Sequence, residues 1–177
     1  PAMYTDYESA VRGKYRDKIT VKPELGSMVT FSHSMKMPYH RWFYYKQGFS
    51  PEFVEYCIRD SKVEPFSKIL DPFCGVGTTL VTGASMSQNV LGFDILPFAV
   101  FISEAKLSKD YDFKKINAKL SEIVENPPRN FTGKWPEVKI IERAFSKDMA
   151  EKILAYKEHI LALNCESTQR FFLVCLL

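Results

Sequence analysis

The stretch that decides the fold is Asp71-Pro72-Phe73-Cys74-Gly75-Val76-Gly77-Thr78-Thr79. A short apolar segment, Lys68–Asp71, precedes it, and a helix is expected to follow from about Thr78 to Ser87. The residues Val90–Asp94 then have the composition of a second buried strand, which again ends in an acid, and another helix is expected at roughly 98–107. The order strand, glycine turn, helix, strand, helix predicts a βαβ unit of a parallel sheet, and hence an α/β fold.

The turn and the acid of the next strand indicate a ligand site. Gly75 and Gly77 allow backbone conformations that other residues avoid, and they let a ligand approach the backbone closely. The helix after the turn presents free N–H groups and the positive end of its dipole. Asp94, 17 residues after Gly77, is expected at the tip of the second strand. There its carboxylate can accept hydrogen bonds from both hydroxyls of a ribose.

Three ligands compete for such a turn. A phosphate-binding P-loop requires a lysine after the glycines, and none is present. A dinucleotide fingerprint requires glycine where Leu80 stands, and the Asp71 carboxylate repels a pyrophosphate. S-adenosylmethionine carries no phosphate, and its ammonium suits an acidic strand end. Asp71 therefore favours this ligand on charge grounds.

The same residues resemble a known family. Residues 71–79 and the following Gly92-Phe93-Asp94-Ile95 are similar to the first two motifs of DNA amino-methyltransferases, which methylate adenine N6 or cytosine N4. Upstream, Arg41-Trp42-Phe43 and Gly48-Phe49-Ser50-Pro51-Glu52 resemble the aromatic segment and helix start that precede the glycine motif. The family usually has Ser or Gly where Val76 stands. The resemblance covers residues 38–107 and implies a Rossmann-like methyltransferase fold.

The resemblance also implies the cofactor, S-adenosylmethionine, and the residues around it. The methionine part is expected near Asp71, Phe73, Gly75 and Gly77. The ribose is expected at Asp94 and the adenine against Ile95. Thr78 and Thr79 at the helix start, and Phe49 and Ser50 of the upstream segment, complete the expected site. For Phe49 and Ser50 a second interpretation, a core aromatic followed by a helix N-cap, stays open. The scattered cysteines and histidines have no metal-ligand spacing, so no metal is expected.

The catalytic motif of the family is not evident. In the resembled enzymes an Asp/Asn/Ser-Pro-Pro-aromatic tetrapeptide accepts the hydrogens of the target amine and stacks on a flipped-out base. The nearest sequence here is Asn126-Pro127-Pro128-Arg129, in which Arg129 replaces the aromatic residue. Pro-Pro at that place ordinarily ends a helix. The catalytic residues therefore stay unknown, with Asn126 as the one candidate that the sequence offers.

The chain divides into three expected parts: an N-terminal arm or loop at 1–37, with a short strand near Ser27–Phe31, a cofactor-binding βαβ region at 38–110, and a helical region at 111–177. The helical region is expected to contain helices up to Pro127 and over Ser146–Leu163, followed by an unpaired apolar end. A methyltransferase sheet and a base-recognition region need more chain than follows Asp94. The expectation is therefore the N-terminal, cofactor-binding part of a larger or split enzyme, inactive alone, whose apolar end promotes self-association.

Composition limits the remaining choices. The 177 residues carry a net charge of +3 and no apolar run long enough to cross a bilayer. Four separated cysteines fit a reducing cytoplasm better than a disulfide-bonded secreted domain. The favoured function is S-adenosylmethionine-dependent methylation of an exocyclic amine of DNA, in a restriction-modification setting, with DNA as partner and no membrane. Two alternatives stay open: an RNA base methyltransferase, and a non-catalytic module that binds the cofactor or a partner protein.

Overall fold

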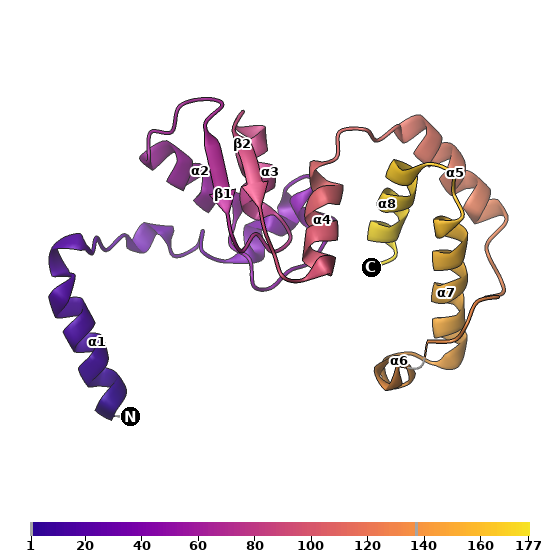
Figure 1. The fold of residues 1–177 in the computed structure, drawn as a ribbon, viewed down its shortest axis with the longest axis horizontal. Coiled ribbons are helices and arrows are strands. Elements are labelled where there is room, and N and C mark those ends of the chain that lie inside the picture. Colours follow the sequence, from indigo (N-terminus) through magenta and orange to yellow (C-terminus); the bar gives the residue numbers. More distant parts are fainter. Residues whose placement is uncertain (1, 137) are drawn as a thin grey trace.

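A two-stranded parallel sheet forms the middle of the molecule (Figure 1). The computed structural model describes residues 2–136 and 138–177. Strand β1 (Lys68–Asp71) pairs with β2 (Asn89–Gly92), so that Asp71 lies opposite Gly92. Helix α3 (Thr78–Ser85) connects the strands, and α4 (Pro97–Leu107) follows the second. The predicted order of elements is confirmed, although β2 ends two residues before Asp94 and α3 ends at Ser85 rather than Ser87.

Among the described residues, helices pack against one face of this sheet. Ile69 and Val90 are half-buried on the side of α3, where a Cβ on Gly83 would lie 2.8 Å from Val90 Cγ1. Leu70 and Leu91 alternate to the other face and are 59% and 56% exposed. Parallel sheets in α/β proteins are normally covered on both faces. The structure therefore contains a methyltransferase-like α/β unit, and not the full sheet of a Rossmann-like fold.

The N-terminal part is helical where it is regular. Helix α1 (Ala2–Lys14), which the sequence did not predict, stands apart from the sheet in Figure 1. Four short 3₁₀ turns lead from it to α2 (Pro51–Asp60): η1 (Arg16–Lys18), η2 (Pro23–Leu25), η3 (Phe31–Lys36) and η4 (His40–Trp42). The expected strand near Ser27–Phe31 is wrong. The Thr30 hydroxyl donates to the Ser27 carbonyl across a turn, and neither sheet strand pairs with this segment.

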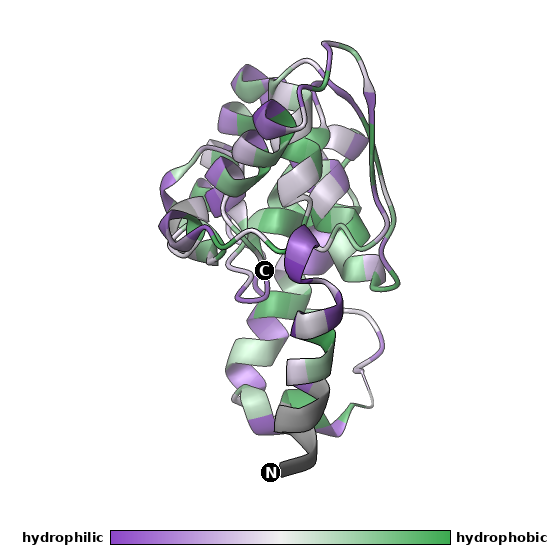
Figure 2. Cartoon of the chain, turned by 90° about the vertical axis from the view of Figure 1, so that its left-hand side faces the viewer, coloured by the Kyte–Doolittle hydropathy of each residue, from purple (hydrophilic) through white to green (hydrophobic). Residues whose placement is uncertain are grey.

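The C-terminal part consists of α5 (Phe113–Glu125), α6 (Lys139–Ala144), α7 (Lys147–Leu161) and α8 (Glu166–Cys175). In Figure 2, hydrophobic and hydrophilic residues lie together on individual helices of the chain, as expected when a helix buries one face. A core cluster forms from the buried residues Ile116, Ile123, Ile160 and Phe172.

The apolar C-terminal end is not unpaired, contrary to the sequence expectation. Phe172 and Val174 are buried because α8 lies between α4 and α7 (Figure 1). Val174 packs with Val76, Ile102 and Ala105 in a second core cluster. The exposed surface on which the expected self-association rested is therefore largely covered, and self-association itself stays a prediction.

Aromatic rings join the helical region to the sheet region. The Trp42 ring lies 5.7 Å from both the Tyr111 and the Phe171 ring centroids, and Tyr111 and Phe171 are 5.6 Å apart. Trp42 is thus a partly buried residue that packs against the core at this junction. No helix in the described part of the chain is long and apolar enough to span a membrane.

Candidate cofactor-binding site

The glycine turn between β1 and α3 has a backbone that requires its glycines. Gly75 has φ +50° and Gly77 has φ +83°, in the left-handed region. A Cβ on Gly77 would lie 2.9 Å from Ser103 Oγ, and one on Gly75 would lie 3.3 Å from the Tyr45 ring. Conformation and close packing together explain both glycines.

The Asp94 carboxylate is fixed to this turn. Its Oδ2 accepts a hydrogen bond of 2.9 Å from the Gly75 N–H, and its Oδ1 accepts one of 2.9 Å from the Leu96 N–H. A carboxylate offers about four acceptor positions. Asp94 is therefore oriented by the backbone and keeps acceptor capacity for the hydroxyls of a ligand.

The second acid, Asp71, lies at the neighbouring strand end. Its Oδ1 accepts a 3.0 Å hydrogen bond from the Phe73 N–H, which starts the turn. The Phe93 N–H donates to the Asp71 carbonyl and the Cys74 N–H to the Phe93 carbonyl, both over 2.9 Å. The carboxyl ends of the two strands thus meet at the turn, as the sequence predicted.

A cavity of about 230 Å³ opens beside the turn. Its lining includes five predicted cofactor residues, namely Phe49, Phe73, Gly75, Thr78 and Asp94, together with Tyr45, Gln47, Gly48, Cys74 and Val76. The structure does not bring Asp71, Gly77, Thr79, Ile95 or Ser50 into this lining. Ile95 adjoins Asp94 and is 93% exposed, whereas Thr79 lines a neighbouring apolar groove.

The position of Ser50 favours a helix cap. Its side chain is fully buried, and its Oγ accepts a 3.3 Å hydrogen bond from the Phe53 N–H at the start of α2. Phe49 lies against Phe53 with ring centroids 5.8 Å apart and also lines the cavity. Ser50 therefore shapes the site through α2, while Phe49 contacts the cavity directly.

Two side chains of α4 that sequence reasoning missed hold the turn from behind. Ser103 Oγ donates to the Gly75 carbonyl over 2.9 Å, and Lys106 Nζ donates to the Val76 carbonyl over 3.0 Å. Burial lowers the pKa of Lys106 to about 8. Burial and the Lys106 charge lower the pKa of His40 to about 4. The sequence feature that could have identified Ser103 and Lys106 is the presence of two polar residues on the otherwise apolar face of this helix.

Tyr45, Gln47 and Gly48 are further cavity residues that the sequence did not assign. The signal was the unusual aromatic density of residues 38–49 directly upstream of α2. The Tyr45 ring packs against Gly75, so this segment forms the wall opposite the turn. Such an approach between segments 30 residues apart depends on tertiary structure.

The catalytic candidate lies elsewhere. Asn126 is the exposed C-cap residue of α5. In Figure 1, α5 runs away from the sheet along the helical region. Asn126 is absent from the cavity lining, and its place at a helix end agrees with the helix-stop interpretation of Pro127-Pro128.

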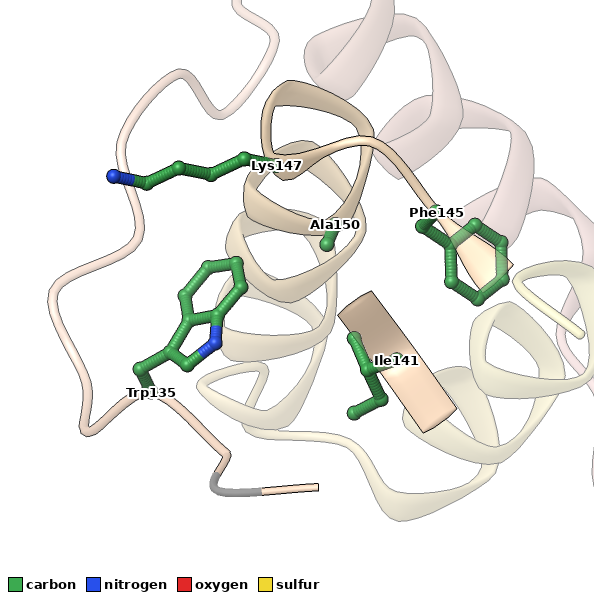
Figure 3. Close-up of a pocket in the computed structure, with 5 residues that line it drawn as sticks. All are labelled: Trp135, Ile141, Phe145, Lys147 and Ala150. Atoms are coloured by element: carbon green, nitrogen blue, oxygen red, sulfur yellow. The ribbon is translucent and has the colours of Figure 1, made fainter. Parts of the chain in front are cut away.

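A second cavity, of about 460 Å³, lies in the helical region (Figure 3). Trp135, Ile141, Phe145, Lys147 and Ala150 line it, and the Lys147 amine points away from its centre in this view. In this lining set Lys147 is the one ionisable residue. The cavity contains no predicted cofactor residue.

The cavity beside the glycine turn suits a nucleoside without phosphates. An oriented carboxylate is present for ribose hydroxyls, and the Phe49 and Phe73 rings supply apolar surface. The cavity's described lining residues include neither lysine nor arginine. Nearby glycines let a ligand reach the backbone. The residues present therefore fit S-adenosylmethionine better than a nucleotide.

Similarity to known proteins agrees with this chemistry. Residues 5–105 match the family model of the N6/N4 DNA methylases. The Type II methyltransferase M.BsoBI of Geobacillus stearothermophilus is 31% identical over 130 residues, 73% of this chain and 26% of that protein. The Type II methyltransferase M.AvaI of Nostoc sp. is 27% identical over 181 residues, 97% of this chain and 37% of that protein.

A shorter match is to the tRNA (guanine(10)-N2)-dimethyltransferase of Methanothermobacter thermautotrophicus, 38% identical over 58 residues, 33% of this chain and 17% of that protein. No solved structure matches the chain. The chain spans between about a quarter and just over a third of the length of the two Type II relatives. The family model covers more than half of the chain, so the chain belongs to the N6/N4 DNA methylase family, whose methyl donor is S-adenosylmethionine.

Proposed function

We propose that this chain supplies the cofactor-binding portion of an enzyme that methylates an exocyclic amine of a DNA base. The observation that carries the proposal is the Asp94 carboxylate, held by the Gly75 N–H at the edge of a cavity with aromatic walls. S-adenosylmethionine supplies a methyl group activated by a positively charged sulfur. The contribution of the chain is to bind and orient this donor, because positioning is the main protein contribution to such a displacement.

Each residue of the site has a proposed task. Asp94 accepts the ribose hydroxyls, and Ile95 lies against the adenine. Phe73 and Phe49 exclude water from the bound nucleoside. Thr78 presents the start of α3. The remaining predicted residues act at the margin: Asp71 holds the ammonium, Gly77 and Thr79 shape the helix start, and Ser50 fixes α2.

The target-base side of the enzyme is proposed to come from further polypeptide, in the same chain or in a separate subunit. The bare sheet face with Leu70 and Leu91, together with the exposed Phe93 just after β2, supports this, because apolar residues of parallel strands are normally covered. The greater length of the Type II relatives supports it as well. That polypeptide would cover the sheet face and bring the Pro-Pro-aromatic motif. Whether adenine N6 or cytosine N4 is the target depends on it.

Calorimetry of the 177-residue chain with S-adenosylmethionine tests the cofactor proposal. Asp94→Ala should weaken binding by about 1–3 kcal/mol, because it strands hydrogen-bonding groups of ligand and turn. Asp17→Ala, which removes an exposed carboxylate from η1, is the control and should leave affinity unchanged. Equal affinity of the wild-type and Asp94→Ala chains would refute the ribose assignment.

A methyl-transfer assay tests the division of labour. With labelled S-adenosylmethionine and DNA, the chain alone should bind the donor without transferring its methyl group. Turnover by the chain alone would show that the catalytic groups are already present.

Methylation of RNA is the second candidate, and the match to the tRNA dimethyltransferase favours it specifically. Adding the missing polypeptide and comparing transfer to duplex DNA and to structured RNA separates the two. The third possibility is a non-catalytic binding module. If the chain binds S-adenosylmethionine but no methyl group is transferred even after the missing polypeptide is added, this third possibility is supported.

A further inference from the structure

Helix α4 presents two buried polar side chains, one helical turn apart, to the glycine turn. Ser103 and Lys106 are 3% and 4% exposed, and they donate to the carbonyl oxygens of Gly75 and Val76. Residues three apart lie on the same helix face. Both carbonyl oxygens are thereby directed toward α4 and not toward the cofactor cavity, whose lining includes neither Ser103 nor Lys106.

The buried charge of Lys106 needs an explanation other than packing. An ammonium loses its hydration when it is buried, and the cost is several kcal/mol unless it is compensated. Ile102 and Ala105 beside it are completely buried. No ion pair to Lys106 is formed by a carboxylate in the described part of the chain. A methionine would fill the same space without this cost. The side chain nevertheless stays largely protonated at neutral pH, because burial lowers its pKa only to about 8.

Lys106 lies directly behind one end of the cofactor cavity. It lines a narrow space together with His40, Tyr45, Gly48, Val76 and Thr78. The last four of these also line the cofactor cavity. The residues that separate the Lys106 ammonium from the cofactor cavity therefore line both spaces. His40 is neutral at neutral pH, since its pKa is about 4, and it adds no second charge.

We infer that Lys106 determines cofactor specificity by favouring a carboxylate at the end of the cavity formed by Gly48 and Thr78. The inference rests on the proposed function and adds the recognition of one chemical group. The methionine end of S-adenosylmethionine carries both an ammonium and a carboxylate. Asp71 suits the ammonium, whereas a cation for the carboxylate is missing from the described cavity lining. Lys106 supplies that charge through the wall, and its bond to Val76 removes a carbonyl dipole from the cavity side.

Two ligands that differ only in the carboxylate test this role: S-adenosylmethionine and decarboxylated S-adenosylmethionine. Lys106→Met should weaken binding of the first about tenfold, the size expected for losing one partly screened charge interaction. Binding of the second should change less than about twofold. Lys106→Arg keeps the charge and should preserve the wild-type preference. Lys109→Met, at the exposed lysine three residues later, is the control and should change neither affinity.

The ratio of the two affinities distinguishes charge recognition from a structural role. If Lys106→Met weakens both ligands equally, the side chain only supports the turn and the inference is overturned. Circular dichroism confirms that the variant folds. Should Lys106→Met unfold, Lys106→Gln, which can still donate to Val76 without a charge, provides the same ratio. If the wild-type chain binds neither ligand, the proposed function itself fails, and this inference fails with it.

Discussion

The helical core and the outer face of the sheet differ in how their apolar residues are covered. Helices α5, α7 and α8 enclose Ile116, Ile160 and Phe172 in a core of their own. In the sheet region, by contrast, Leu91 and Phe93 remain more than half exposed. A helix needs to bury only a stripe, which neighbouring helices cover, whereas a parallel sheet needs a layer on each face. The difference indicates where a further layer of protein would bind.

The largest expected effect tests this contrast with two phenylalanines. Phe172→Ala should lower the free energy of unfolding by about 3–5 kcal/mol, because it empties a packed site in the helical core. Phe93→Ala should change it by less than about 0.5 kcal/mol, because that side chain is exposed. Urea denaturation measures both. A large loss for Phe93→Ala would mean that the sheet face is covered in solution.

The next effect concerns pH and sharpens the description of the sheet region. Burial and the Lys106 charge lower the pKa of His40 from 6.5 to about 4. Between these two pH values His40 therefore binds a proton in the unfolded chain but not in the folded chain. The free energy of unfolding consequently falls as the pH drops from 6.5 to 4. The loss should reach about 3 kcal/mol, since each pKa unit is worth about 1.4 kcal/mol.

Thermal denaturation of the wild-type and His40→Asn chains between pH 7 and 4 isolates this contribution, because the carboxylates titrate in both. The variant should lose less stability on acidification. Parallel curves for the two proteins would show that His40 is not buried as described.

The smallest expected effect comes from replacing a glycine of the turn by alanine, compared with the same replacement in an ordinary helix. Gly77→Ala should destabilise the chain by about 1–3 kcal/mol, because of the positive φ and the contact with Ser103. Gly13→Ala in α1 is the matched control, since nothing lies within 4 Å of its Cβ position. It should be neutral or slightly stabilising, because alanine favours helix. Equal effects in thermal denaturation would contradict the geometry of the turn.

Local sequence patterns predicted much of the sheet region. The glycine turn, the two strands and the position of Asp94 followed from residue types close together in the chain. The helix starts at Ser50-Pro51 and Ser146 followed in the same way, because caps act within one helical turn. The strand expected near Ser27–Phe31 failed, since a strand needs a neighbour to pair with, and residue type alone does not supply one.

The sequence by itself determined the βαβ unit, its glycine turn and the acids at its strand ends, because these depend on short-range backbone preferences. Only the tertiary structure decided which side chains surround the turn. Tyr45, Ser103 and Lys106 reach it from about 30 residues away, and Val174 reaches the same core from the C-terminal helix. Such contacts depend on how whole helices and strands pack together, and the local pattern of residues along the chain does not specify that packing.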